Sequence, residues 1–205
     1  MKILIVGASG SVGSAVAADL GAEFEIITAG SNSGDVLVDI TSSQSIIAMY
    51  AKVGKIDAVV STVGKVAFKP LNELTEIDFN SSFANKFMGQ INLVLLGQKY
   101  LSTGGSFTLT SGILSHEFIP NGLCASAVNG AINSFVKASA LELMHSDLRI
   151  NAISPTILEG SYQDFYPLFS GFYPVSSKKV AFAYRKSVTG VQTGQVFSVG
   201  HHHNS

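Results

Sequence analysis

Charged residues, cysteine and long apolar runs are all scarce in this 205-residue chain. Only 13% of the residues are charged while 46% are hydrophobic, which leaves little polar material to cover a large surface. We therefore expect a homodimer or homotetramer that buries one face. Cys124 is the one cysteine, which excludes an internal disulfide and fits a reducing, cytoplasmic location. No apolar stretch reaches the roughly 20 residues that a membrane-spanning helix requires, so no membrane partner is expected.

Clusters of basic residues are also missing. The net charge is −1, and no block of Lys and Arg could neutralise a run of nucleic-acid phosphates, so no nucleic-acid partner is expected. Glycines from Gly7 onward interrupt the apolar start of the chain too early for a signal peptide. Near the other end, His201–His203 could be a metal-binding tract. Residues 201–205 are interpreted instead as a tail or a purification tag, and no metal site is expected.

Short β-branched runs alternate with longer helical patterns, an order typical of a parallel sheet with crossover helices. Because the strands are continuous apolar runs, helices should cover both faces of the sheet. The sequence predicts one doubly wound α/β domain over residues 1–200 with about seven strands. The expected strands are Lys2–Val6, Phe24–Thr28, Val36–Val38, Asp57–Ser61, Ser106–Thr110, Arg149–Ile153 and Gln195–Val199. The expected helices are Ser11–Leu20, Ser43–Val53, Thr75–Gln98, Cys124–Met144 and Ser176–Lys186.

A glycine-rich loop, Gly7–Gly13, follows the first expected strand and opens the first expected helix. Its glycines permit a tight turn and a close approach of backbone to ligand, and the free amides of the helix start favour a pyrophosphate. This placement favours a Rossmann-like dinucleotide site over a plain glycine-rich turn. The loop residues expected to contact the cofactor are Gly7, Ser9, Gly10, Ser11, Val12 and Gly13.

The second expected strand ends without the acid that usually binds the ribose hydroxyls of NAD. Ser31, Asn32 and Ser33 stand there instead, and their short side chains could hydrogen-bond a 2′-phosphate. We therefore expect NADP as the cofactor, with NAD and an ordinary polar turn as the alternatives.

Several further segments, by their order and spacing, make the chain similar to the short-chain dehydrogenase/reductase family over almost its whole length. These segments are Val38–Thr41, Asp57–Gly64, Ser106–Gly112, Asn151–Pro155 and Thr193–Gly200. The resemblance implies a catalytic serine at Ser111. It also implies cofactor contacts by Asp39, Ile40, Ser61, Thr62, Val63, Gly64, Pro155 and Ile157. Two departures stand out: Ser61–Gly64 replaces the family's Asn-Asn-Ala-Gly, and Thr156 stands where glycine is usual.

The family's catalytic acid, a tyrosine four residues before a lysine, is absent, because no tyrosine of the chain has a lysine four positions on. Aligning Phe135–Leu143 with the family's helix places Ala125 at the tyrosine position and Asn129 at the lysine position. Lys86 stands where the family carries a catalytic asparagine, so a lysine and an asparagine are exchanged between two helices. A desolvated Lys86 could act as an acid or electrostatic stabiliser. The alternative is a solvated helix lysine.

Other candidate proton donors are His116, Tyr162, Tyr166 and Cys124, each with a simple packing or surface role as the alternative. The aromatic segment Gly160–Pro174 has two interpretations. It is either a mobile loop stabilised by its own rings or a lid over an apolar substrate pocket.

The sequence favours an NAD(P)(H)-dependent oxidoreductase that acts on a small carbonyl or alcohol substrate. Its expected catalytic residues are Ser111, Lys86 and Asn129. Because the fold alone does not fix the function, the alternative is a non-catalytic dinucleotide-binding sensor or scaffold.

Overall fold

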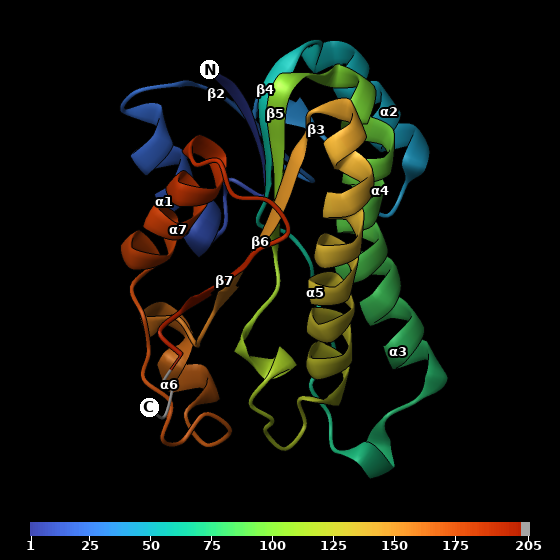
Figure 1. Ribbon diagram of the computed structural model, residues 1–205. Helices are drawn as coiled ribbons and strands as arrows, with labels where there is room; N and C mark the ends of the chain where they lie inside the picture. The colour runs from blue at the N-terminus through green and yellow to red at the C-terminus, as the bar shows by residue number, and fades with distance from the viewer. Residues whose placement is uncertain (202–205) are drawn as a thin grey trace.

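The computed structural model describes residues 1–201, and its centre is a parallel sheet of seven strands (Figure 1). The strands are β1 (Lys2–Val6), β2 (Glu25–Gly30), β3 (Val36–Leu37), β4 (Ile56–Ser61), β5 (Leu101–Thr110), β6 (Arg149–Pro155) and β7 (Val196–Val199). Their order across the sheet is β3-β2-β1-β4-β5-β6-β7. The order in which strands are added thus reverses between β1 and β4, and open α/β sheets bind ligands beyond the carboxyl ends of the strands at such a point. The prediction of a doubly wound, Rossmann-like sheet is confirmed.

Helices cover both faces of this sheet (Figure 1). On one face α1 (Ser11–Gly21) packs against α7 (Ser177–Thr189), and on the other lie α2 (Ser43–Val53), α4 (Gly89–Gly97) and α5 (Leu123–Leu143). α3 (Glu76–Ser82) leads into α4, and α6 (Tyr162–Phe165) lies beyond the carboxyl ends of the strands. Short 3-10 helices are η1 (Leu71–Glu73), η3 (Gln98–Tyr100), η4 (Ile113–Ser115), η5 (Met144–Ser146) and η6 (Glu159–Ser161). Within residues 1–201, no helix is long and apolar enough to cross a membrane.

The apolar strands supply two separate cores because alternate residues point to opposite faces of the sheet. In β1, Ile3 and Ile5 pack against the α1 and α7 layer, whereas Leu4 and Val6 belong to the core under α2, α4 and α5. All four side chains are fully buried, and each contributes about 1.5–3 kcal/mol. Burial on both faces is the reason that the strands read as unbroken apolar runs.

The helix expected over residues 75–98 contains a π-helical segment, η2 (Phe83–Met88), between α3 and α4. The fully buried Gln90 stabilises this irregularity, because its amide nitrogen donates to the carbonyl of Lys86 at 3.1 Å and to that of Thr110 at 2.9 Å. Its amide oxygen accepts from the Thr110 backbone nitrogen at 2.8 Å. Gln90 thereby fixes η2 against the carboxyl end of β5. Short π segments inside helices occur frequently at functional sites.

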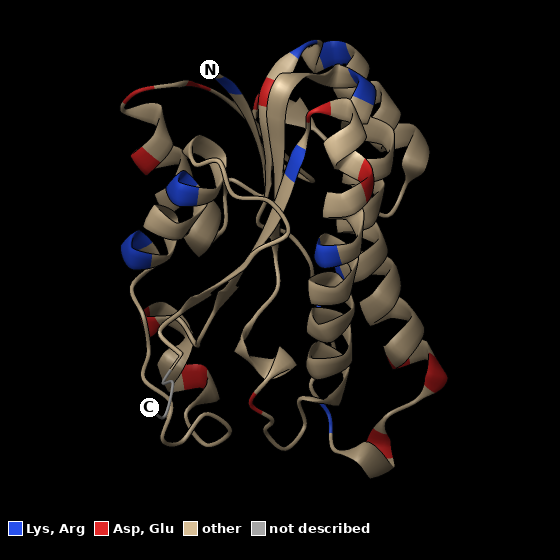
Figure 2. Ribbon diagram, viewed as in Figure 1, with Lys and Arg blue, Asp and Glu red and all other residues tan. Residues whose placement is uncertain are grey.

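Charged residues of the strands stand at one end of the sheet only. Lys2, Glu25, Asp57 and Arg149 are all at or next to the amino ends of their strands, and the charged strand positions in Figure 2 lie at the upper end of the view. The carboxyl ends of the described strands therefore carry no charge of their own. Any charge at the binding edge of the sheet must come from loops and helices.

Candidate functional site

The glycine-rich loop joins β1 to α1 at the reversal point of the sheet. Gly7 has φ +95°, and a Cβ on Gly13 would lie 2.1 Å from the carbonyl oxygen of Gly7, so neither position tolerates a side chain. Gly10 differs, because the nearest atom to a Cβ there is 3.5 Å away. Gly10 is also the N-cap of α1, and no side chain caps that helix end. This loop thus provides an open approach to uncapped backbone amides, which suits an anion.

Thr62 holds the glycine-rich loop in place. Its hydroxyl lies 3.1 Å from the carbonyl oxygens of both Val6 and Gly7, to which it donates. Val63 packs directly on Gly7. Ser61 departs from the expectation of a cofactor contact, because it is completely buried and offers no exposed atom to a ligand.

The polar turn after β2 is closed by its own carboxylate. Asp35 accepts hydrogen bonds from the backbone nitrogen of Thr28 at 2.8 Å and from its hydroxyl at 2.7 Å. These bonds hold the pKa of Asp35 below its usual value. The three expected phosphate contacts, Ser31, Asn32 and Ser33, form the exposed tip of this turn. The acid next to β2 is therefore engaged within the turn, and the exposed tip carries hydroxyl and amide groups.

The remaining expected cofactor contacts come from the segment after β3 and from the carboxyl end of β6. Asp39 is exposed and accepts from both the backbone nitrogen and the hydroxyl of Thr41, which lowers the pKa of Asp39. Ile40 packs against Gly89 at the start of α4. Pro155 and Ile157 lie at the carboxyl end of β6 and line the pocket described below.

The three expected catalytic residues come together from three elements. The Lys86 ammonium, from η2, donates to the Asn129 side-chain oxygen on α5 at 2.8 Å and lies 3.3 Å from the carbonyl oxygen of Ser111, just after β5. The Ser111 hydroxyl donates to the backbone carbonyl of Asn129 at 3.2 Å. The lysine and the asparagine whose positions are exchanged relative to the family are thus in direct contact.

Lys86 is a partly buried cation that has only neutral hydrogen-bond partners. Burial lowers its pKa to about 8, and no described carboxylate forms an ion pair with it. Its aliphatic part packs on Gly64, where an added Cβ would lie 2.4 Å from the Lys86 Cγ. This contact connects the lysine to the segment Ser61–Gly64, whose Thr62 holds the glycine-rich loop. The alternative of a fully solvated helix lysine does not fit these contacts.

A pocket of about 500 Å³ opens in front of these three residues. Ala125 forms part of its wall, so the position of the family's tyrosine contributes a methyl group and no hydroxyl. The polar lining residues include Lys65, Lys86, Ser111, Asn129, Thr156 and Ser161. The apolar lining residues are Val66, Phe68, Ile113, Leu114, Ala125, Pro155, Ile157, Leu158, Phe165 and Phe169. Its size and apolar character are those of a small-molecule site.

The aromatic segment Gly160–Pro174 supplies one wall of this pocket. Phe165 and Phe169 line it, and the Phe165 ring lies 5.5 Å from that of Phe68, which comes from the segment after β4. Such ring pairs stabilise a contact beyond simple area burial. The segment therefore contacts the opposite side of the pocket, as a cover over an apolar site would.

The other candidate proton donors lie outside the lining of this pocket. Tyr162 and Tyr166 pack on each other with ring centroids 5.4 Å apart. Cys124 is completely buried. His116 contacts His201, with ring centroids 6.2 Å apart. The first residue of the predicted tail, His201, therefore packs against the domain. The rest of the predicted tail, residues 202–205, lies outside the described residues.

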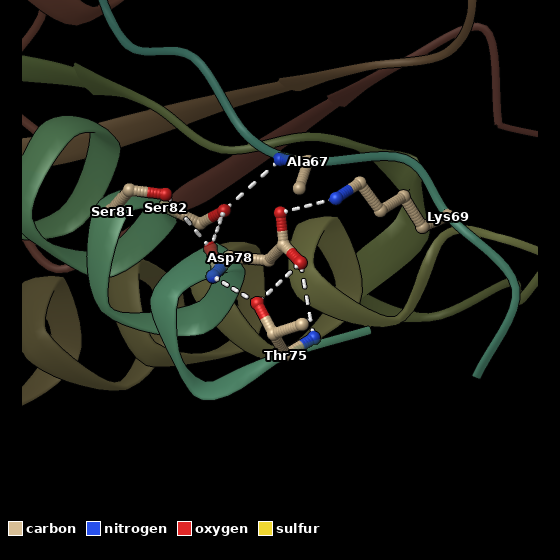
Figure 3. Close-up of polar contacts among 6 residues, drawn as sticks. All are labelled: Ala67, Lys69, Thr75, Asp78, Ser81 and Ser82. Atoms are coloured by element: carbon tan, nitrogen blue, oxygen red, sulfur yellow. Dashed lines mark hydrogen bonds and ion pairs between the residues drawn. The ribbon is translucent and has the colours of Figure 1, made fainter. Parts of the chain in front are cut away.

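A network of hydrogen bonds around Asp78 anchors the segment that carries Phe68 (Figure 3). Asp78 pairs with Lys69 at 2.8 Å and forms a capping box with Thr75 at the start of α3. The Ser82 hydroxyl donates to the carbonyl of Asp78 at 2.7 Å and accepts from the backbone nitrogen of Ala67 at 3.0 Å. Both ends of the segment around Phe68 are thus tied to α3, which positions this wall of the pocket. In the sequence, Thr75-x-x-Asp78 is a recognisable capping pattern, but the contacts of Asp78 with Lys69 and of Ser82 with Ala67 depend on the fold.

Comparison with known proteins identifies the family. The family model described as enoyl-(acyl carrier protein) reductase matches residues 8–191. The chain belongs to the short-chain dehydrogenase/reductase family. One relative of this family, the short chain dehydrogenase/reductase AacuN from Aspergillus aculeatus, is 28% identical over 200 residues, which cover 86% of this chain and 75% of AacuN. The chain is thus a member of a family of oxidoreductases.

Similar solved structures agree with the fold. The protein lin1944 from Listeria innocua is 50% identical, with a TM-score of 0.95 over 97% of this chain and 99% of that chain. A small-chain dehydrogenase crystallised in complex with NADPH is 26% identical, with a TM-score of 0.86 over 97% of this chain and 96% of its own. Several other curated relatives are matched over only about half of their length.

Proposed function

We propose that this member of the short-chain dehydrogenase/reductase family is an NADP(H)-dependent enzyme that interconverts a small carbonyl compound and its alcohol. The observation that carries the proposal is the contact of Lys86 with Gly64 and Asn129. This contact places the Lys86 ammonium between the segment Ser61–Gly64, which lies behind the glycine-rich loop, and the apolar pocket. A hydride donor bound along that loop and a carbonyl bound in the pocket would therefore meet beside this ammonium.

The residues at the loop fit a dinucleotide. Gly7 and Gly13 are sterically required to be glycine, and the missing side chain at Gly10 lets a diphosphate approach the start of α1. The exposed turn Ser31–Ser33 has no acid that would repel a 2′-phosphate, which supports NADP. The similar small-chain dehydrogenase in complex with NADPH supports the same choice. The dinucleotide supplies or accepts the hydride when it is bound.

In this proposal, residues of the chain stabilise the charge on the substrate oxygen and supply its proton. During carbonyl reduction a negative charge develops on that oxygen, and the Lys86 ammonium stabilises it from within a partly desolvated site. Lys86 then supplies the proton to the oxygen and regains one from water, which its pKa of about 8 allows near neutral pH. Asn129 orients the ammonium by accepting its hydrogen bond at 2.8 Å. Ser111, 2% exposed, contributes a hydroxyl at the floor of the pocket.

The second candidate function is a non-catalytic NADP sensor, which the alanine at position 125 favours because no tyrosine acid is present. Two measurements distinguish the functions. NADPH and NADH are titrated by their fluorescence, and aldehydes, ketones and quinones are then screened for NADPH oxidation. Tight NADPH binding without turnover of any of these would support the sensor and overturn the enzyme.

Lys86→Met tests the role of the lysine directly. We expect turnover to fall at least 100-fold while the Kd for NADPH changes less than threefold. Lys137→Met, which removes an exposed lysine of α5, is the matched control and should leave both values unchanged. Unchanged turnover in Lys86→Met would eliminate Lys86 as the charged catalytic group.

We also propose that the protein assembles as a homodimer or homotetramer. The outward faces of α4 and α5 carry apolar side chains, and Leu95, Leu141 and the adjoining Met144 are 54%, 65% and 60% exposed. Exposed apolar patches of this kind favour association. Light scattering that gave the mass of one chain would contradict this proposal.

A further inference from the structure

Building on the function proposed above, we propose that the natural substrate is an aromatic 2-oxo carboxylate, whose carboxylate and adjacent carbonyl oxygen both contact Lys86. Three observations on the pocket support this inference: its unbalanced positive charge, the position of that charge at the floor, and the aromatic walls above it.

The charge of the pocket is unbalanced. Lys86 lies at its floor and Lys65 at its rim, and none of the described residues that line it is acidic. The ammonium of Lys86 has two neutral oxygen partners, from Ser111 and Asn129. A partly buried cation without a counter-anion favours a ligand that brings one. The rim lysine adds to the attraction of an anion toward the pocket.

The position of Lys86 restricts where the anion lies on the substrate. The same ammonium stands beside the Ser111 segment, where the carbonyl oxygen of the substrate is expected. One ammonium group has three N–H donors, of which two are directed at Ser111 and Asn129. The carboxylate must therefore be adjacent to the carbonyl for both to share this cation. A 2-oxo carboxylate has this arrangement.

The walls above the floor indicate the rest of the molecule. Phe68, Phe165 and Phe169 line the pocket, with centroid separations of 5.5 Å for Phe68 and Phe165 and 6.3 Å for Phe165 and Phe169. Ile113 and Leu114 complete the apolar surface. These side chains suit a flat ring and provide no partner for a polar tail. Pro155 and Ile157, which are expected to contact the cofactor, also line this pocket of about 500 Å³, so the part left for the substrate suits a single ring.

The test compares phenylglyoxylate with its neutral analogue phenylglyoxylamide and with pyruvate. Binding to the protein saturated with NADP⁺ is measured by calorimetry, so that the glycine-rich loop is already filled and cannot hold the acid. We expect phenylglyoxylate to bind at least tenfold more tightly than either the amide or pyruvate. Equal affinities for the acid and the amide would overturn the inference. Failure of NADPH to bind in the prior titration would instead overturn the proposed function.

Variants assign the preference to individual side chains. Lys86→Met should reduce the preference for acid over amide to less than twofold, whereas Lys137→Met should retain it. Phe165→Ala should weaken both aromatic probes about equally and leave their ratio unchanged. A preference that survived Lys86→Met but disappeared in Lys65→Met would contradict the assignment to the floor lysine.

Discussion

Burying a cation without a counter-anion predicts a measurable loss of stability at Lys86. Burial lowers the pKa of Lys86 from 10.5 to about 8. A difference of this size between the folded and the unfolded chain corresponds to about 3 kcal/mol. This figure is an upper limit, because part of the side chain reaches solvent. At neutral pH this desolvation cost lowers the free energy of unfolding of the wild type, and the hydrogen bonds of the ammonium to Ser111 and Asn129 offset part of it.

The sign of the pH dependence follows from which state binds the proton. Below pH 8 Lys86 is charged in both states, so the folded protein bears the full cost of desolvation. Between pH 8 and 10.5 the folded protein releases the proton while the unfolded chain keeps it, so the free energy of unfolding rises with pH. Relative to Lys86→Met, which cannot titrate, the wild type should gain about 2–3 kcal/mol between pH 7 and pH 10.

The assay is urea unfolding of both proteins from pH 7 to pH 10. Far-UV circular dichroism is the suitable signal, since the chain has no tryptophan. At pH 7 Lys86→Met should be about as stable as the wild type, because the lost hydrogen bonds offset the relieved desolvation. Lys137→Met should follow the wild type at every pH. A constant difference between wild type and Lys86→Met across this range would refute the argument, since it would mean that Lys86 is as solvated as an ordinary lysine.

Three further predictions concern the glycine-rich loop, the pocket and the Asp78 network that positions the wall carrying Phe68. Gly10→Val should raise the Kd for NADPH at least tenfold and lower the urea midpoint only slightly, because a Cβ there would make an ordinary contact at 3.5 Å while valine is a poorer N-cap than glycine; an unchanged Kd would exclude the loop as the diphosphate site. Ala125→Phe should fill the pocket and abolish ketone turnover, while fluorescence titration gives an NADPH Kd within twofold of wild type; normal turnover would place the substrate elsewhere. Hydrogen bonds from Lys69 and Thr75 lower the pKa of Asp78 to about 2, so its contribution to stability is complete above pH 3.8 and lost as the pH falls through 2. Asp78→Asn should therefore lower the urea midpoint at pH 6, with the gap closing toward pH 2; an equal gap at both values would argue against an ionic role.

The parts of the fold set by local pattern could be predicted from the sequence. The glycine-rich loop was placed correctly because the glycines needed for its tight turn stand directly after an apolar strand. α2 was predicted at its observed bounds, Ser43–Val53, because Ser42 caps its start and Gly54 ends it. β5 was predicted too short, since it begins at Leu101 and continues through Gly104 and Gly105 beside a register shift against β4. Glycines at such irregularities conceal a strand from sequence patterns.

The arrangement of the candidate site could be predicted only in part. The vacant tyrosine position and the Lys86–Asn129 exchange could be inferred from single positions, but the contact of Lys86 with Asn129 depends on how η2 and α5 pack against each other on one face of the sheet. The π-helical segment η2 is stabilised by the side chain of Gln90, which binds the backbone of Lys86 and Thr110, and no helical periodicity predicts these bonds. The pairing of Phe68 with Phe165 likewise joins segments almost a hundred positions apart.

The direct contact between Lys86 and Asn129 also constrains how such a site could arise or be lost over generations. Changing Lys86 alone to asparagine would remove the cation and leave the side-chain oxygen of Asn129 without this hydrogen-bond donor. Changing Asn129 alone to lysine would press two ammonium groups together at a separation now closed to 2.8 Å, where like charges repel strongly. Each single change alters the charge of this contact, so we expect the lysine and the asparagine to be retained together. Homologous chains with the same site should therefore carry this lysine and this asparagine together.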